Sequence, residues 1–204
     1  NTSTIKVNIN GKSRNFIINS NIELYVDNLL ASLAVISNFL DLNNISEKFF
    51  LNYNLPEGRG DYKYIKINKK KIHLIDESYN SNPLSLEFAL NNFNKLRSQS
   101  KRKIILLGDM LELGKFSKKL HLEAAEKVNN TRINRVYVYG KEILYTFNKI
   151  RPQKRGKILY SRRDVSIFLN NDIKDGEYLM IKGSNSTGLN TIAKNLKSGK
   201  IHVI

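Results

Sequence analysis

The chain has 204 residues, a net charge of +16 and no cysteine, so its length allows one medium domain and part of another. The lack of cysteine excludes disulfides and thiolate metal sites, and it suits a reducing compartment such as the cytoplasm. The histidines His73, His121 and His202 lie far apart in the sequence, which excludes a histidine-based zinc motif.

A β-hairpin followed by helices is predicted over residues 1–59. Extended segments between residues 5 and 18 flank an Asn-Gly pair, which is typical of tight hairpin turns. Apolar residues then recur at helical spacing over 26–40, and Ser46 is expected to cap a second short helix. The Pro-Glu-Gly-Arg-Gly run at 56–60 predicts a linker, with a domain boundary after residue 59.

Strands alternate with helices over residues 60–204. Two extended segments, near 62–67 and 72–76, predict a second hairpin. Further strands are expected at 104–107, 136–139, 158–160, 178–182 and 202–204, and helices at 84–96, 118–129, 141–149, 162–170 and 187–197. This alternation predicts an α/β fold, with a mostly parallel open sheet and helices on both faces.

Polar or glycine-containing segments follow four of the predicted strands. They cover residues 76–82, 108–114, 140–141 and 182–188. Ligands of open α/β sheets bind outside the carboxyl ends of the strands, so we expect these segments to gather on one edge that faces a ligand or another domain. A purely structural role is the alternative, in which Asn80 and Asn82 form turns and cap the next helix and the glycines only permit tight turns.

Neither a GxxxxGK[ST] loop nor a GxGxxG fingerprint occurs in the sequence. If the protein handles a nucleotide, the loop that cradles its phosphates is therefore expected outside these residues, before Asn1.

Three motifs resemble one protein family. IDESYNSNP at 75–83 is similar to the IDDSYNANP motif of those Mur ligases that add D-alanyl-D-alanine to the peptidoglycan precursor. ILLGDMLELGKFSKKLH at 105–121 and LMIKGSNSTGL at 179–189 resemble two later signatures of the same ligases, in the same order. The resemblance implies a Rossmann-like Mur ligase C-terminal domain at 60–204. It also implies that residues 1–59 are the tail of the central ATPase domain.

The resemblance implies an ATP-dependent amide ligase of the cytoplasm. Its substrates would be UDP-N-acetylmuramoyl-tripeptide and D-alanyl-D-alanine, joined through an acyl phosphate. The phosphate-binding loop and the Mg²⁺ ligands of the family precede the region matched here. The chain is therefore expected to work with the N-terminal and central domains of a longer protein, and not to catalyse the reaction alone.

The resemblance also implies roles for individual residues. Arg59 and Glu77 would act in catalysis, Arg59 by reaching the ATP phosphates and Glu77 from the place of a family aspartate on the nucleotide side. Residues expected to bind ATP are Asn28 (near the adenine), Arg59, Glu77, Ser78, Tyr79 and Asn80, and residues expected to bind substrate are Asn80, Asn82, Lys182 and Ser184. The sequence departs from the family pattern at Glu77, at Asn185 where arginine is usual, and at residues 22–25, where a Gly-Arg-His-Asn lead-in is missing.

Two alternatives stay open at this point. The net charge of +16 would suit a nucleic-acid or polyanion-binding module, although the basic residues are scattered and short basic runs fall at the edges of predicted elements. A related Mur ligase that adds a different amino acid is the second alternative, and the SYNSN and GDMLELG segments argue against it.

Overall fold

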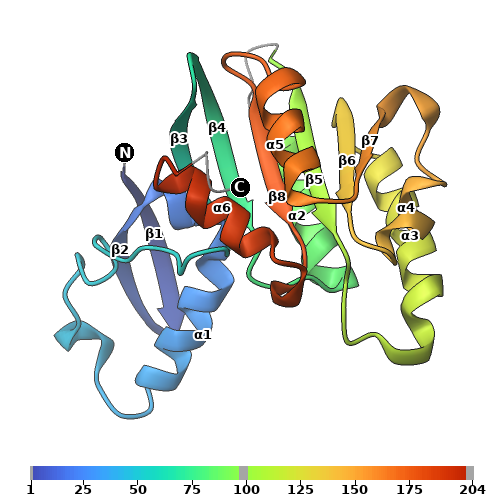
Figure 1. Cartoon of the computed structure of the whole chain (residues 1–204). Helices are drawn as coiled ribbons and strands as arrows, with labels where there is room; N and C mark the ends of the chain where they lie inside the picture. The colour runs from blue at the N-terminus through green and yellow to red at the C-terminus, as the bar shows by residue number, and fades with distance from the viewer. Residues whose placement is uncertain (1, 97–100, 201–204) are drawn as a thin grey trace. The chain divides into compact units, whose positions relative to one another are not determined.

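The computed structural model describes residues 2–96 and 101–200. The chain divides into two compact units, Asn1–Pro56 and Glu57–Ile204 (Figure 1). The division falls within the predicted linker, just before the expected boundary at residue 59.

The first unit begins with the predicted hairpin. Strands β1 (Thr2–Ile9) and β2 (Lys12–Asn19) pair antiparallel. Asn10 and Gly11 between them have φ of 52° and 77°, the left-handed pair that a two-residue hairpin turn needs. The 3₁₀ helix η1 (Ser20–Tyr25) leads into α1 (Val26–Ile36). The buried core of the unit consists of Val7, Phe16, Ile18, Ile22, Leu29, Leu33, Leu42, Ile45 and Phe50.

Of the two helices predicted in the first unit, one is shorter than expected and the other does not form. Helix α1 ends at Ile36 and not at residue 40, because the Asn38 side-chain amide donates to the Ala34 carbonyl (2.9 Å) and competes with the helical backbone. The segment after Ser46 forms turns, and a short 3₁₀ helix, η2 (Leu42–Asn44), precedes it. There, the Glu47 carbonyl accepts a hydrogen bond from the Ile17 amide of β2 (2.8 Å), so it is not available to a helix.

A six-stranded sheet forms the centre of the second unit (Figure 1). Its strand order is β3-β4-β8-β5-β6-β7, and only the β3–β4 pair among these neighbours is antiparallel. The strands are β3 (Asp61–Ile67), β4 (Lys70–Glu77), β5 (Lys103–Gly108), β6 (Arg135–Tyr139), β7 (Arg155–Leu159) and β8 (Tyr178–Lys182). The mostly parallel sheet is therefore confirmed. The strand predicted at 202–204 lies outside the described residues.

Helices cover both faces of this sheet, as predicted. One layer packs α2 (Pro83–Lys95), α3 (Ser117–Asn129) and α4 (Ile143–Phe147) against the sheet, and the other packs α5 (Arg162–Asn171) and α6 (Leu189–Lys197). Strand β5 shows the alternation that makes this possible, since Ile104 and Leu106 face the α5–α6 layer while Ile105 and Leu107 face the other. Helix α4 is shorter than the predicted 141–149, and the 3₁₀ helices are η3 (Gly114–Phe116), η4 (Pro152–Lys154) and η5 (Asn185–Thr187).

The ends of β5 and β8 approach one another closely at two glycines. A Cβ atom on Gly183 would lie 2.9 Å from the Leu189 Cδ1 and 3.2 Å from the Gly108 Cα. Both distances are shorter than ordinary van der Waals contacts between carbon atoms. Glycine at this position therefore lets α6 begin close to the sheet.

Gly183→Ala is expected to destabilise the protein by about 1–3 kcal/mol, because the added methyl group overpacks the junction with Leu189. Urea denaturation of the variant and of Ser186→Ala, an exposed position in the same loop, measures the effect. The cost of Gly183→Ala should be smaller in a Leu189→Ala background. An unchanged midpoint for Gly183→Ala would contradict the crowding that the geometry implies.

Candidate functional site at the carboxyl edge of the sheet

The parallel strands of the second unit end at the same level. Glu77 of β4 and Leu107 of β5 both lie beside Lys182 of β8, and Gly108 lies beside Tyr139 of β6. The segments after these strands therefore start from one edge, called the carboxyl edge here, as the sequence predicted. Because β3 is antiparallel, Asp61 at its start lies opposite Asp76 on the same edge.

Ser184 joins three of these loops. Its hydroxyl accepts a hydrogen bond from the Leu111 amide (2.9 Å) and donates to the Ser81 carbonyl (3.2 Å). Its own amide donates to the Asp109 carbonyl (3.0 Å). Ser184 is buried, so in this structure its side chain connects the loops to one another. Its predicted contact with substrate stays a prediction.

Lys182 supports the loop that follows β4. Its side chain is 1% exposed, and its ammonium donates to the Asn80 carbonyl (2.9 Å). Burial lowers the pKa of the Lys182 ammonium, and the negative charge of Glu77 beside it partly offsets this effect. The predicted contact of Lys182 with substrate remains untested, while its contact with the loop is direct.

The turn before β3 and the loop after β4 are bonded to each other. The Tyr79 amide donates to the Gly58 carbonyl (3.0 Å), and the Gly60 amide donates to the Asp76 carbonyl (2.7 Å). The Arg59 guanidinium lies over the Tyr79 ring, 4.3 Å from its centroid, a distance at which cation and ring attract. Both Arg59 and Tyr79 are exposed, so they are presented to solvent as a pair.

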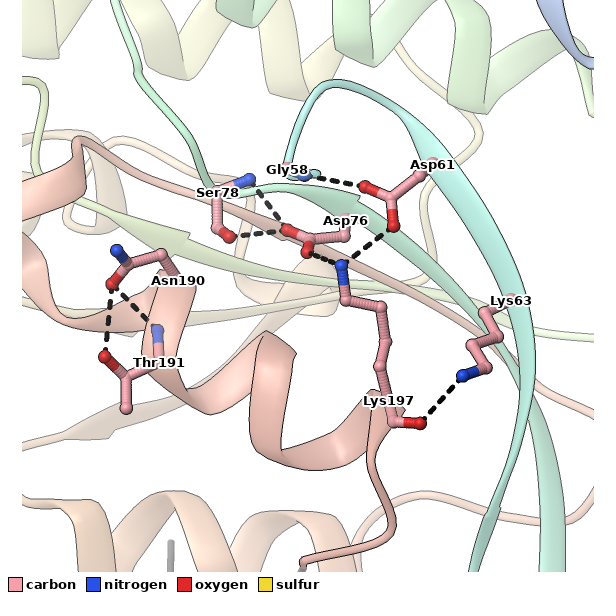
Figure 2. Close-up of polar contacts among 8 residues, drawn as sticks. All are labelled: Gly58, Asp61, Lys63, Asp76, Ser78, Asn190, Thr191 and Lys197. Atoms are coloured by element: carbon pink, nitrogen blue, oxygen red, sulfur yellow. Dashed lines mark hydrogen bonds and ion pairs between the residues drawn. The ribbon is translucent and has the colours of Figure 1, made fainter. Parts of the chain in front are cut away.

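A partly buried ion-pair network joins Lys197 to Asp61 and Asp76 (Figure 2). The Lys197 ammonium, in the last turn of α6, is 2.8 Å from the Asp61 Oδ2 and 2.7 Å from the Asp76 Oδ2. Burial disfavours the charge on Lys197, but the hydrogen bonds and charges of the two aspartates outweigh it and raise the pKa of Lys197. Sequence reasoning assigned no role to Asp61 or Lys197, because no local pattern relates them.

The two predicted asparagines of the loop take part in turns. The Asn80 Oδ1 accepts from the Ser81 amide (2.7 Å). The Asn82 Oδ1 accepts from the Ser85 amide (2.8 Å) and the Ser85 hydroxyl accepts from the Asn82 amide (3.0 Å), which is a capping box for α2. The predicted capping of the helix by Asn82 is therefore confirmed. Both side chains are exposed, and their binding of ligand stays a prediction.

Asp109 and His121 fix the loop after β5. The Asp109 carboxylate accepts from the amides of Lys141 (3.1 Å) and Ile143 (2.7 Å). The Met110 amide donates to the His121 Nε2 (3.1 Å), and the other ring nitrogen lies 2.9 Å from the Ser117 carbonyl. His121 is fully buried, so its ring is an internal support of the loop. Both residues fall within the recognised motif, but their partners could not be read from it.

The remaining predicted site residues differ in burial and in the unit to which they belong. Glu77 is half-buried at the end of β4 and Ser78 is buried, with its amide 3.0 Å from the Asp76 Oδ1. Asn28 lies in the first turn of α1, in the first unit, and its side chain is exposed. Its predicted place near the adenine stays a prediction.

A family model described as "Mur ligase, glutamate ligase domain" matches residues 63–185. The match begins within β3, includes β4 through β8, and ends within the segment that follows β8. The chain belongs to the Mur ligase family. Its loops at the carboxyl edge are therefore those of a Mur ligase domain.

Similar curated Mur ligases carry one name. The UDP-N-acetylmuramoyl-tripeptide–D-alanyl-D-alanine ligase of Rickettsia prowazekii is 31% identical over 149 residues, which are 72% of this chain and 32% of that protein. The ligase of the same name from Bacillus subtilis is 26% identical over 128 residues, 61% of this chain and 28% of that protein. The chain thus spans less than a third of the length of either relative.

Solved Mur ligase structures share the fold. A crystal structure of MurF from Acinetobacter baumannii has a TM-score of 0.77 and 20% identity, and the match covers 97% of this chain and 42% of that one. The MurF ligase of Thermotoga maritima in complex with ADP has a TM-score of 0.73 and 18% identity, over 99% of this chain and 44% of that one. At these identities the likeness concerns the fold.

Gly58→Ala should lower the free energy of unfolding of this Mur ligase domain more than Gly114→Ala does. Both glycines have positive φ, 75° and 52°, which costs an alanine about 1–2 kcal/mol. A Cβ on Gly58 would also lie 2.8 Å from the Tyr79 amide nitrogen, whereas one on Gly114 would meet nothing within 4 Å.

We therefore expect an additional loss of about 1–3 kcal/mol at Gly58. Urea denaturation of both variants measures the difference. Equal losses of unfolding free energy in the two variants would contradict the close approach of Gly58 to the Tyr79 amide.

Proposed function

We propose that the protein containing this chain is an ATP-dependent ligase that adds D-alanyl-D-alanine to UDP-N-acetylmuramoyl-tripeptide in peptidoglycan precursor synthesis. The 31% identity with the Rickettsia prowazekii ligase of that name, over 72% of this chain, carries the proposal. The ordered IDESYNSNP, GDMLELG and KGSNSTG segments support it as well. In this proposal residues 1–59 form the C-terminal end of the central ATPase domain. The second unit then supplies one wall of the active site.

The proposed reaction has two steps. The terminal carboxylate of the tripeptide attacks the γ-phosphorus of ATP, the bond from that phosphorus to the ADP oxygen breaks, and an acyl phosphate forms. The amine of D-alanyl-D-alanine then attacks the acyl carbon, phosphate leaves, and the nitrogen loses a proton as the amide forms. Phosphoryl transfer of this kind depends mainly on positioning and on neutralising charge, and domain closure provides both while it expels water.

The described residues suit the nucleotide side of such a site. Arg59 is exposed and its guanidinium is steadied by the Tyr79 ring at 4.3 Å, so it would meet the ATP phosphates with little loss of side-chain freedom. Glu77 is half-buried beside Lys182 and would contact the nucleotide in the role of the family aspartate. Asn80 and Asn82 are exposed on the adjoining loop and would face the incoming dipeptide.

Magnesium would supply charge neutralisation at the transferred phosphate in this reaction. Among residues 2–96 and 101–200, no group of three or more His, Asp or Glu side chains could hold a metal ion. Within the same residues, no helix is both long and apolar enough to cross a membrane.

The requirement for both substrates tests the proposal. The full-length protein is incubated with ATP, Mg²⁺ and UDP-N-acetylmuramoyl-tripeptide, and ADP release is measured with D-alanyl-D-alanine, with D-alanine or L-amino acids, and without an acceptor. We expect sustained ADP release only with the dipeptide. Release that is indifferent to the dipeptide would overturn the proposal, and faster release with a single amino acid would favour a different Mur ligase activity.

Glu77→Gln tests the role of that carboxylate. A charge-assisted hydrogen bond contributes about 1.5–3 kcal/mol, so we expect kcat/KM for ATP to fall by roughly ten- to a hundredfold. Glu77→Asp should retain most activity because it restores the residue usual in the family. Glu123→Gln, on the exposed face of α3, is the matched control. Unchanged kinetics for Glu77→Gln would show that the carboxylate takes no part.

A further inference from the structure

Lys197 occupies a central position between two strands of the second unit. It lies in the last turn of α6, and its side chain is 10% exposed. Figure 2 shows its ammonium between the carboxylates of Asp61, at the start of β3, and Asp76, near the end of β4. A single cation thus contacts both strands of the edge hairpin at the carboxyl edge.

Each of these carboxylates uses its second oxygen for the backbone of a loop. The Asp61 Oδ1 accepts from the Gly58 amide (2.7 Å), and the Asp76 Oδ1 accepts from the Ser78 amide (3.0 Å) (Figure 2). A carboxylate that is held at one oxygen by an ammonium has little freedom to turn the other. Lys197 is therefore linked through two carboxylates to two backbone amides.

These two amides flank the exposed pair of the candidate site. Gly58 directly precedes Arg59, and Ser78 directly precedes Tyr79. The Tyr79 amide donates to the Gly58 carbonyl (3.0 Å), so a backbone hydrogen bond joins the two loops. A shift in either carboxylate would therefore displace the Arg59 guanidinium, the Tyr79 ring, or both.

Removing the ammonium would leave two carboxylates facing one another. Lys63 also reaches Lys197, but its ammonium donates to the Lys197 carbonyl (2.9 Å) (Figure 2). Lys194, the other lysine in the last turn of α6, is exposed. Like charges at short range repel strongly where water is partly excluded, so the two carboxylates would move apart.

We propose that Lys197 is a positioning residue that sets the placement of Arg59 and Tyr79 for ATP by holding Asp61 and Asp76 together. The proposal rests on the proposed function in one respect, that this pair faces the nucleotide. The competing role is simple attachment of α6 to the sheet. The apolar residues Leu189, Ile192, Ala193 and Leu196 already provide such attachment, since all four are buried in the core.

Kinetics of the full-length protein provide the first test. Lys197→Met keeps the length of the side chain and removes its charge, and we expect KM for ATP to rise by roughly ten- to a hundredfold, because small displacements of positioning groups are costly. Asp61→Asn combined with Lys197→Met restores the charge count and should recover much of the affinity. Lys194→Met is the control and should match wild type.

Amide hydrogen exchange of the same proteins, followed by mass spectrometry, separates positioning from attachment. We expect faster exchange in Lys197→Met within 57–62 and 77–82, with 189–196 unchanged. Faster exchange across 189–196 with the two loops unchanged, or an unchanged KM for ATP, would overturn the proposal.

If Lys197→Met does not fold, Asp61→Ala serves as the second variant. It removes the acceptor of the Gly58 amide and should speed exchange within 57–62 more than within 77–82, and equal or absent effects would overturn the proposal. The exchange readout needs no ATP turnover. A wild-type protein that releases no ADP would therefore refute the ligase proposal without deciding the contacts of Lys197.

Discussion

The backbone hydrogen bonds that join β8 to its parallel neighbours β4 and β5 position the candidate site. Their register places Glu77 and Leu107 on either side of Lys182, so the loops after all three strands begin at one level. Gly108 and Gly183 then allow the ends of β5 and β8 to lie close together and α6 to start against them. Every later contact of the site, including the bridge made by Ser184, depends on this common level of the strand ends.

Buried and half-buried polar side chains hold the loops of this shared edge in place. Lys182 holds the Asn80 carbonyl, Ser184 holds the Leu111 amide and the Ser81 carbonyl, and Asp109 holds the start of α4. Each of these bonds joins a side chain to the backbone of a loop, which fixes the course of the loop and leaves its exposed side chains outward. A rigid support of this kind is what a binding loop needs to present groups in one geometry.

Local patterns in the sequence predicted most of the fold and part of the site. The alternation of apolar runs was sufficient for the parallel sheet and its two helical layers, because strands such as Ile104–Leu107 are buried on both sides. The helix expected after Ser46 failed because a distant strand, β2, takes the Glu47 carbonyl. The motifs located the loops, but whether a loop residue is exposed like Tyr79 or buried like Ser184 depends on packing between segments far apart in the sequence.

The ion pair between Lys197 and Asp61 joins residues 136 positions apart. A nascent chain grows at about 5–20 residues per second, so roughly 7 to 27 seconds of translation separate these two residues on the ribosome. The turn that carries Arg59 is therefore synthesised before α6, the helix whose Lys197 contacts Asp61. Until α6 has been synthesised, Asp61 lacks the ammonium that it contacts in the folded protein.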